Sequence, residues 1–523
     1  MDNQTKPAIG KFVIENLTIG MYDNPRCIYR EYIQNSADAI DKAVDLSLVT
    51  KKDAIVYIQI DPDKRTIIFE DNGTGISQEK VASILLDVAQ SDKEIGKEKG
   101  FRGIGRLGGL AYCEKLIFET SYKGENAKSI MIWDAKRLKQ VISDRTKKEE
   151  AAQVIANVTE FKTESEETEK HYFKVIMSNV TNLELLEESE IKDYLKMVAP
   201  LPFDSHFIFR TKIYEELKND ELFIDEYNIY VNNEQIYKGY TTYLYESRNN
   251  SQGREKIGEV KDIVFFKAKD QNEQWLYWGW HSISNIQNKQ LGKANKSRGL
   301  RLRKNNIQIG DENRLEALFG RNPTDTRFHF YVIGEVYAIH NNLIPNGRRD
   351  DFEDEQTYNL FKGKLKVICA EIKRLANQTS DLVSAQRRIA KYTEGLREFE
   401  LKQNQGFVSK EEQQNLIQDL QIKKKEAEEG KRTIERVSKT FGEGNETTPL
   451  IKVFNEIVKN DVIKSNGTES VAFIDKPVFR TDKLSKLSKA ERKLLSNVFV
   501  IIKNVLSEEL AENLIRKIEE EYK

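Results

Sequence analysis

The stretch Arg30–Asp41 reads Arg-Glu-Tyr-Ile-Gln-Asn-Ser-Ala-Asp-Ala-Ile-Asp, and its pattern decides the fold. Apolar residues recur in it at about helical spacing, which predicts a half-buried helix. In that helix Glu31, Asn35 and Asp38 lie on one face, because residues three and four positions apart are neighbours. Burying two carboxylates and an amide costs desolvation energy, so this face is expected to line a pocket for a metal ion and a polar ligand. The alternative is an ordinary amphipathic helix with a solvated polar face.

Length and composition indicate a soluble protein of several domains. The 523 residues allow roughly three domains, each with its own core. Lys+Arg 83 against Asp+Glu 84 leave a net charge of −1, which argues against a protein that coats nucleic acid over its whole surface. Three widely separated cysteines (Cys27, Cys113, Cys369) predict a reducing compartment and no metal cluster. The sequence shows neither a signal-peptide core nor an apolar run of membrane-spanning length, so we expect a cytoplasmic protein without a membrane partner.

The pattern around the first stretch predicts a sheet interrupted by helices and loops. Strands are expected at 54–60, 66–70, 115–120, 128–133 and 172–177. A helix should run from Ser77 to Ala89, with Ser77 as its N-cap. The polar segment Lys147–Lys170 is predicted to be a loop or an insertion. Paired prolines in 198–203 predict the first domain boundary.

A first glycine-rich loop, Asp71-Asn-Gly-Thr-Gly, stands where a strand ends and a helix begins, the position at which ligands reach sheet edges. Its glycines allow a flat ligand to approach the backbone closely. Asp71 is suited to accept a hydrogen bond from an exocyclic amine such as that of adenine. The alternative is a plain glycine turn between strand and helix.

A second glycine run, 100–110, contains Gly103, Gly105 and Gly108 in the GxGxxG spacing. A dinucleotide site would require a buried strand before the run, whereas a charged segment, Ser91–Lys99, precedes it. We therefore expect a charged lid, Ser91–Gly109, that closes into a helix beginning near Leu107. Backbone N–H groups of such a loop and helix end are suited to hold phosphate oxygens.

Taken together, the three stretches resemble the Bergerat-fold ATPases, the GHKL group of gyrase, heat-shock chaperone, histidine kinase and MutL-type proteins. The resemblance covers about Phe12–Val180 in the order and spacing of its motifs. It implies an α+β fold: a Bergerat-fold α/β sandwich ATPase domain, a transducer-like α/β domain, and a helical, coiled-coil C-terminal region. It also implies ATP and Mg²⁺ as cofactors.

The resemblance implies a role for individual residues. Glu31 would be the general base that orients and deprotonates the attacking water, and Asn35 would give an oxygen to Mg²⁺. Asp71 would bind the adenine amine, and Asp38 would brace the site unless it lies at the surface. One departure is that the Gly-Thr pair on a later strand in the family has no counterpart in 171–175, His-Tyr-Phe-Lys-Val. The other implied nucleotide-binding residues are Gly73, Gly75, Ile76, Gly100, Gly103, Ile104 and Gly105.

A later segment, Ile344-Pro-Asn-Gly-Arg-Arg-Asp, resembles the part of heat-shock chaperones in which a middle-domain arginine reaches the terminal phosphate. We expect Arg349 in this role, with Arg348 as second choice and Lys289 and Lys304 as weaker candidates. A guanidinium offers forked donors that suit phosphate oxygens. The alternative is a basic surface turn beside acidic residues.

The C-terminal part shows an apolar residue at every seventh position, which predicts a helix packing along a partner seam. These residues are Phe361, Ile368, Leu375, Leu382, Ile389 and Leu396. A second helix, about Lys410–Lys439, suggests a helical hairpin, so the seam serves either a homodimer, which we favour, or packing within one chain. The expected domains are 1–198 (ATP-binding), 199–354 (transducer-like), 355–441 (hairpin or coiled coil) and 442–523 (helical).

Three outputs fit these features. The first is a chaperone-like, ATP-hydrolysing conformational switch that acts on a protein client. The second is a MutL- or MORC-like clamp on nucleic acid, using a half-exposed strand with a basic outer face. The third is a nucleotide-binding scaffold that never hydrolyses ATP. The basic residues in question are Lys296, Arg298, Arg301, Arg303 and Lys304.

Overall fold

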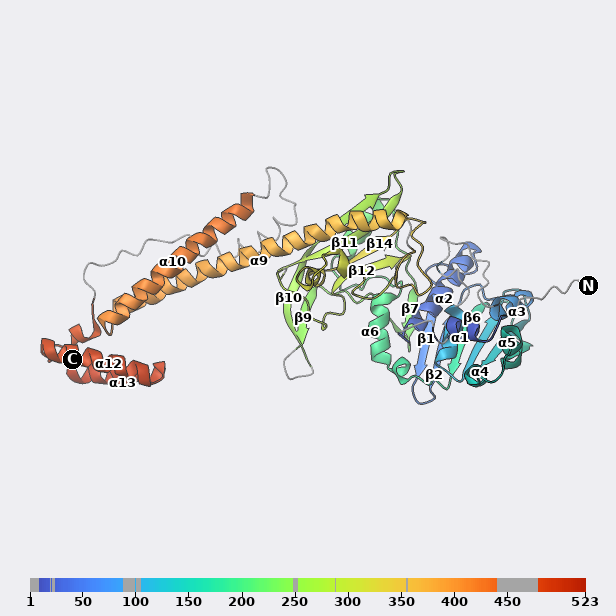
Figure 1. The fold of residues 1–523 in the computed structure, drawn as a ribbon, viewed down its shortest axis with the longest axis horizontal. Coiled ribbons are helices and arrows are strands. Elements are labelled where there is room, and N and C mark those ends of the chain that lie inside the picture. The colour runs from blue at the N-terminus through green and yellow to red at the C-terminus, as the bar shows by residue number, and fades with distance from the viewer. Residues whose placement is uncertain are drawn as a thin grey trace, which may run out of the picture. The chain divides into compact units, whose positions relative to one another are not determined.

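The computed structural model describes residues 9–18, 20, 24–87, 99, 105–247, 253–286, 288–353, 356–439 and 478–523. The chain divides into two compact units, Met1–Lys373 and Arg374–Lys523. The first unit contains two β-sheets with their helices, and the second is helical (Figure 1). This arrangement confirms the predicted class, a mixed α/β part followed by helices. Within the described ranges, no helix combines the length and the apolar character needed to cross a lipid bilayer.

The first sheet has eight strands in the order β5-β4-β3-β6-β2-β1-β7-β8, antiparallel except for the β1–β7 pair. It takes β7 and β8 from beyond Val198, so this sheet extends past the expected boundary, and the division into domains stays a prediction. The strands are β1 (Ile55–Asp61), β2 (Thr66–Asp71), β3 (Lys115–Ser121), β4 (Ala127–Asp134), β5 (Thr159–Ser165), β6 (Tyr172–Ser178), β7 (Asn228–Val231) and β8 (Glu234–Gln235).

Helices pack against this sheet, and α2 contacts strands β1 and β2 of the sheet as well as helix α6. Tyr29 and Tyr32 of α2 pack on Phe69 of β2, with ring centroids 5.1 and 4.8 Å apart. The predicted helix is confirmed, and it is buried over most of its length. The helices of this layer are α1 (Phe12–Thr18), α2 (Cys27–Asp45), α3 (Gln78–Leu86), α4 (Ala135–Ser143), α5 (Ala151–Val158) and α6 (Glu188–Val198), with short 3-10 helices η1 (Gly105–Ala111) and η2 (Leu183–Leu186).

The segment Lys147–Lys170, for which the sequence predicts a loop or an insertion, is not a loop. It contains helix α5 and strand β5, which pairs with β4 from Ala127↔Ser165 to Trp133↔Thr159. Strand β5 lies at the edge of the sheet, and six of its seven residues are exposed. An exposed edge strand needs few apolar residues, so the hydrophobic alternation that signals a strand is weak here.

The second sheet has six strands in the order β13-β12-β14-β11-β10-β9. Its core is aromatic: Phe203, Phe207 and Tyr240 surround Trp280, with ring centroids 5.1–6.1 Å from it. The strands are β9 (Tyr243–Ser247), β10 (Arg254–Lys269), β11 (Trp275–Ser284), β12 (Gly299–Lys304), β13 (Ile307–Gln308) and β14 (Ile333–Ala338). Helices α7 (Arg210–Asn219) and α8 (Pro323–Thr326) and the short 3-10 helices η3 (Glu316–Leu318) and η4 (Arg327–Tyr331) accompany them.

Strand β12 forms as predicted, but the prediction that it has a basic outer face is wrong. All six of its residues are buried, and of the five basic residues in this region only Lys296 is exposed. Arg298 and Arg301 lie 2.7 and 3.4 Å from the carboxylate of Glu312. These arginines have acidic partners inside the unit, so strand β12 offers no basic surface to nucleic acid.

Arg303 of β12 belongs to a buried ionic network. Its guanidinium pairs with Glu335 and donates to the carbonyls of Asn306 and Met197 at 2.8 and 2.7 Å. Lys238 lies 2.8 Å from the same carboxylate. Burial opposes the charge of Glu335, but Arg303 and Lys238 outweigh this effect and hold its pKa at about 2. Because Met197 belongs to α6, the network connects the second sheet to one of the helices that pack on the first sheet.

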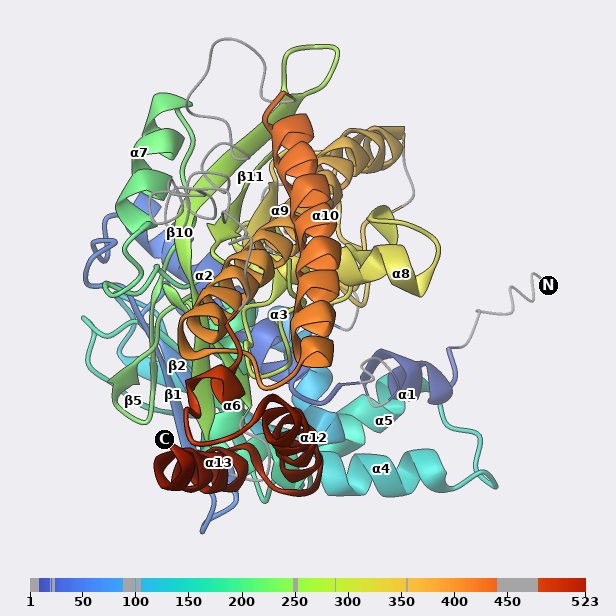
Figure 2. The same cartoon turned by 90° about the vertical axis from the view of Figure 1, so that its left-hand side faces the viewer.

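The second unit consists of helices, and α9, which begins in the first unit, continues into it. Helix α9 is followed by α10, and their buried residues pack on one another as a hairpin. Leu396 and Phe399 of α9 pack with Leu420 of α10, so the chain itself covers this part of the heptad seam. The hairpin alternative therefore holds for these residues. The helices are α9 (Gln356–Gln405), α10 (Lys410–Lys439), η5 (Arg480–Lys483), α12 (Lys489–Val505) and α13 (Glu508–Tyr522), the last two side by side (Figure 2).

Candidate functional site

Helix α2 carries the polar residues from which the site is built. Glu31 and Asp38 are 6% and 4% exposed, whereas Asn35 is partly exposed. Buried carboxylates are costly unless other groups pair with them. Three chain segments approach α2, and each brings a different kind of partner.

The first partner is the end of the second glycine run. A Cβ atom at Gly105 would lie 2.6 Å from Oε2 of Glu31, so the backbone of residue 105 rests directly on the carboxylate. The other oxygen of Glu31 lies 3.4 Å from Nε of Arg30. A side chain at residue 105 would displace the Glu31 carboxylate from this position. Three predicted residues of the same loop, Gly100, Gly103 and Ile104, lie outside the described residues, as does most of the expected lid.

The second partner is the Asp71 loop. The buried carboxylate of Asp71 accepts hydrogen bonds from the Gly73 backbone N–H at 3.0 Å and from the Ser36 hydroxyl. Burial raises the pKa of Asp71 to about 7, and these two hydrogen bonds oppose the rise. A Cβ atom at Gly73 would lie 2.7 Å from Cβ of Ala39. Ser36 and Ala39 belong to α2, so Asp71 and Gly105 meet the same helix.

Thr120 of β3 holds the rest of this loop, and the sequence did not predict its role. Its hydroxyl accepts from the Ile76 backbone N–H and donates to the Tyr172 carbonyl, both at 2.9 Å. Gly75 has φ +64°, and a side chain there would collide with the Ser121 carbonyl. The family's Gly-Thr hydroxyl is missing from β6, but a threonine of the neighbouring strand lies beside the loop.

The third partner is the segment around Arg349. The guanidinium of Arg349, which is 8% exposed, donates to the carbonyl of Lys99. The backbone N–H of Lys99 donates to Asp38 at 2.8 Å, and its ammonium lies 2.5 Å from Asp41. Burial would lower the pKa of Lys99, but Asp225 and Asp41 raise it. Lys99 thus connects Asp38 to Arg349. Its place at the end of the charged segment Ser91–Lys99 does not predict this connection.

The alternatives to Arg349 lie differently. Arg348 is exposed, although its carbonyl accepts a 3.1 Å hydrogen bond from Arg30 of α2. Lys304 is buried and donates to the carbonyls of Ile339 and His340. Lys289 is exposed. Among the four cationic candidates, only Arg349 has a buried side chain that meets the chain next to α2.

The donor set fits a magnesium nucleotide. Mg²⁺ keeps several waters and takes few protein oxygens beside the phosphates, as Asn35 would supply here. The described residues contain no group of three or more His, Cys, Asp or Glu that could hold a metal alone. Arg106, next to Gly105, has a buried Nε without a hydrogen-bond partner among the described residues, and burial lowers its pKa to about 10. Such a cation is suited to a phosphate oxygen.

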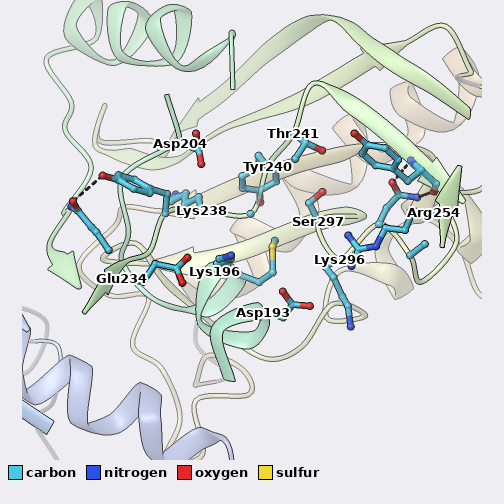
Figure 3. A pocket seen from close by; sticks show the side chains of 17 residues that line it. Asp193, Lys196, Asp204, Glu234, Lys238, Tyr240, Thr241, Arg254, Lys296 and Ser297 are labelled. Carbon is cyan, nitrogen blue, oxygen red and sulfur yellow. Dashed lines mark hydrogen bonds between the residues drawn. The ribbon is translucent and has the colours of Figure 1, made fainter. Parts of the chain in front are cut away.

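Two cavities in the first unit lie apart from this face of α2. One, of about 370 Å³, is lined in part by Asp71, but Tyr57, Glu70 and Tyr172 of its lining alternate toward the other face of the sheet. The second, of about 280 Å³, lies between the two sheets. Figure 3 shows it lined by Asp193 and Lys196 of α6, Lys238, Tyr240, Arg254 and Lys296, among other residues. The described lining of both cavities includes neither Glu31 nor Asn35.

Comparison with known proteins places this geometry in a family. Residues 26–168 match the model of the histidine kinase-, DNA gyrase B- and HSP90-like ATPase domain. The chaperone protein HtpG of Wigglesworthia glossinidia brevipalpis is 33% identical over 172 residues, which are 29% of this chain and 26% of the relative. HtpG of Salinispora tropica is 34% identical over 137 residues, 22% of each chain. HtpG of Pectobacterium atrosepticum is 27% identical over 163 residues, 28% of this chain and 26% of the relative.

The family match covers the part of the chain that holds α2 and both glycine loops. The chain spans only about a quarter of the length of the curated relatives it matches. The predicted resemblance to the GHKL group is confirmed for this part of the chain, because residues 26–168 match the model of that group's ATPase domain.

Proposed function

We propose that this protein is a Mg²⁺-dependent ATPase that works as a chaperone-like conformational switch. The observation that carries the proposal is the meeting of three segments at one helix. Gly105 lies on Glu31, Asp71 bonds to Ser36, and Lys99 joins Asp38 to Arg349. Together with Asn35, these provide an acid, an amide, an adenine-type acceptor and an arginine around helix α2.

In this proposal, each residue performs one task. Glu31 orients and deprotonates the attacking water, and Asn35 supplies an oxygen to Mg²⁺. The ion, when bound, neutralises charge on the phosphates. Asp71 accepts from the adenine amine, with Gly73, Gly75 and Ile76 close to the base. Gly105, together with Gly100, Gly103 and Ile104, surrounds the phosphates.

Arg349 is the proposed sensor of the terminal phosphate. Its side chain is buried and contacts the carbonyl of Lys99, and a guanidinium offers forked donors that suit phosphate oxygens. A phosphate at this place would link the loop after β14 to α2, which is how nucleotide binding would reach the second sheet. A protein client is the expected target, as the name of the chaperone relatives suggests.

The nucleic-acid clamp remains the alternative output, but strand β12 does not support it. Its arginines are buried and paired with Glu312 and Glu335. A salt titration of DNA binding tests this alternative directly, since phosphate contacts make affinity fall steeply with salt. A flat, weak response would leave the chaperone-like output.

The main test replaces Glu31 with alanine. Calorimetry should show that a non-hydrolysable ATP analogue still binds, while phosphate release falls about 10²–10⁴-fold, as expected when a general base is removed. Glu70→Ala is the matched control, because Glu70 precedes Asp71 but its side chain is 42% exposed and pairs with Lys174. Retained turnover in Glu31→Ala would refute the base assignment. A wild-type protein that binds the analogue but releases no phosphate would be a scaffold.

The two neighbouring arginines test the sensor. Arg349→Ala should lower turnover about 10³-fold or more, in the range that arginine fingers contribute. Arg348→Ala removes an exposed side chain and should leave turnover within about twofold of wild type, as a surface change does. Equal losses in both variants would contradict the assignment.

A further inference from the structure

The cavity of about 280 Å³ between the two sheets of the first unit is not used by the proposed ATPase. Its walls come from α6, from the chain around β8 and β9, from the start of β10 and from the loop before β12. Figure 3 shows that most of the side chains in its lining are polar or charged. Pockets for drug-sized ligands begin at about 300 Å³, so this cavity suits a smaller, polar molecule.

Two cations of this lining have no ionic partner among the described residues. They are Arg254 of β10 and Lys296 of the loop before β12, and both residues are exposed. Nearby cations differ from them, since Arg298 lies 2.7 Å from Glu312 and Lys256 lies 3.1 Å from a carboxylate of its own strand. Arg254 and Lys296 are therefore available to an anion.

Ser297 adds a buried hydroxyl to the same wall of the cavity. The residue is 5% exposed, and its hydroxyl makes no hydrogen bond to another residue in the described part of the chain. Buried hydroxyls normally have a partner, as that of Ser282 has in the Ile333 backbone N–H at 3.0 Å. The neighbouring Asn295 holds the loop on β9, because its amide oxygen accepts from the Tyr245 backbone N–H at 2.7 Å. The hydroxyl of Ser297 is thus positioned and still available to a ligand.

The charges of the lining separate into two ends. Figure 3 shows Arg254 and Lys296 at one end and the carboxylates of Asp204 and Glu234 at the other, with Asp193 of α6 between them. Glu234 lies 2.5 Å from Lys192, and Asp204 accepts from a backbone N–H at 2.8 Å. A carboxylate has about four acceptor positions, so both can accept further hydrogen bonds. A matching ligand carries an anionic group at one end and hydrogen-bond donors at the other.

The basic end suits a phosphate better than a carboxylate. A phosphate monoester carries a charge of about −1.5 to −2 at pH 7 and three strong acceptor oxygens. Arg254, Lys296 and Ser297 supply two positive charges and a hydroxyl to match it. The guanidinium of Arg254 has the forked donors that bind two phosphate oxygens at once.

We propose that this cavity binds a small phosphate monoester whose other end carries hydroxyl or ammonium groups, as a phosphorylated sugar or amino alcohol does. The phosphate accepts from Arg254, Lys296 and Ser297, and the other end donates to Asp204 and Glu234. The site is separate from the ATPase, because its described lining contains no residue of α2 or of either glycine loop. Since α6 packs on the first sheet and β10 belongs to the second, the ligand joins the two sheets.

The first experiment titrates the full chain by calorimetry with inorganic phosphate, ribose 5-phosphate and phosphoethanolamine, with ribose as the phosphate-free control. A saturating non-hydrolysable ATP analogue keeps these probes out of the site on α2. We expect at least one ester to bind at least about tenfold more tightly than ribose, because charge-assisted hydrogen bonds hold its phosphate. That ester should also raise the midpoint of thermal unfolding, since it binds only the folded chain.

Esters that both bind no better than ribose would overturn the proposal. A heat signal that appears only without the ATP analogue would belong to the site on α2 and would overturn it as well. Failure of the ATPase proposal leaves this experiment intact, because a chain that binds no nucleotide has no competing site.

Substitutions in the cavity test its residues one at a time. Ser297→Ala and Arg254→Gln should each weaken binding of the ester by about tenfold or more, the value of a hydrogen bond to a charged group. Ser297→Ala should keep the stability of wild type, because the hydroxyl loses no partner within the described chain. Lys293→Gln is the matched control: it lies in the same loop, is exposed and is not part of the lining, so affinity should stay within about twofold. Equal affinity in all three variants would overturn the assignment.

A nucleic-acid backbone is the other source of phosphate groups, and a short single-stranded DNA oligonucleotide is its probe. Each phosphate of that backbone is a diester with a single charge, so we expect weak binding that Arg254→Gln does not change. Binding of the oligonucleotide that depends on Arg254, together with no binding of either ester, would make the cavity a nucleic-acid contact and overturn the small-ligand proposal.

Discussion

Helix α2 and strand β12 both place charged side chains inside the first unit, but these side chains differ in how many partners surround them. Glu31 of α2 is 6% exposed, and within the part of the chain that the structure describes its carboxylate lies 3.4 Å from Nε of Arg30. Arg303 of β12 is fully buried, and Glu335 and two backbone carbonyls occupy its donors. A buried charge with a complete set of partners stabilises the fold. One that faces glycine loops with few partners is available to a ligand.

The largest effect should come from breaking the saturated network. Arg303→Met should lower the free energy of unfolding by about 3–5 kcal/mol, because Glu335 would lose its main partner while remaining buried. Urea denaturation followed by circular dichroism measures the change. Arg436→Met, at an exposed arginine 3.4 Å from Asp381, should stay within about 0.5 kcal/mol of wild type. An equal loss of unfolding free energy in both variants would mean that the buried Arg303 network stabilises the fold no more than an exposed ion pair does.

The next effect concerns a site carboxylate. Asp71→Asn should weaken binding of a non-hydrolysable ATP analogue by about 10- to 150-fold or abolish it, the value of a hydrogen bond to a charged group. Stability should be unchanged or slightly higher, because burial already disfavours the charged form of Asp71. Calorimetry and denaturation on the same samples check both. A loss of stability with unchanged affinity would make Asp71 a structural residue like Arg303.

The smallest effect is a pH dependence of nucleotide binding. The pKa of Asp71 is raised to about 7, so its acceptor form is lost as pH falls below that value. Affinity at pH 6 should therefore be up to about tenfold weaker than at pH 8. His171 contacts the Gly73 carbonyl at 2.7 Å, next to the Asp71 loop, so His171→Gln is the control and should keep the dependence. If the pH dependence of affinity disappears in the His171→Gln variant, the dependence belongs to His171 and not to Asp71.

Local pattern predicted much of the first unit. The spacing of Glu31, Asn35 and Asp38 and the two glycine loops predicts one site, and the family match covers residues 26–168, which contain them all. Periodicity also predicted strand β12, but the prediction that its basic side chains are exposed is wrong. Alternation shows that side chains point to two sides, but it does not show whether a second layer covers the polar side.

The sequence by itself determined which chemical groups the site would contain, because motif residues keep fixed spacing along helix and loops. Only the tertiary structure decided which charges serve it. Lys99, Ser36 and Thr120 became parts of the site through contacts with residues distant in sequence, whereas Arg301 and Arg303 became internal supports. The physical reason is that the cost of a buried charge depends on partners brought by folding, and those partners lie far away along the chain.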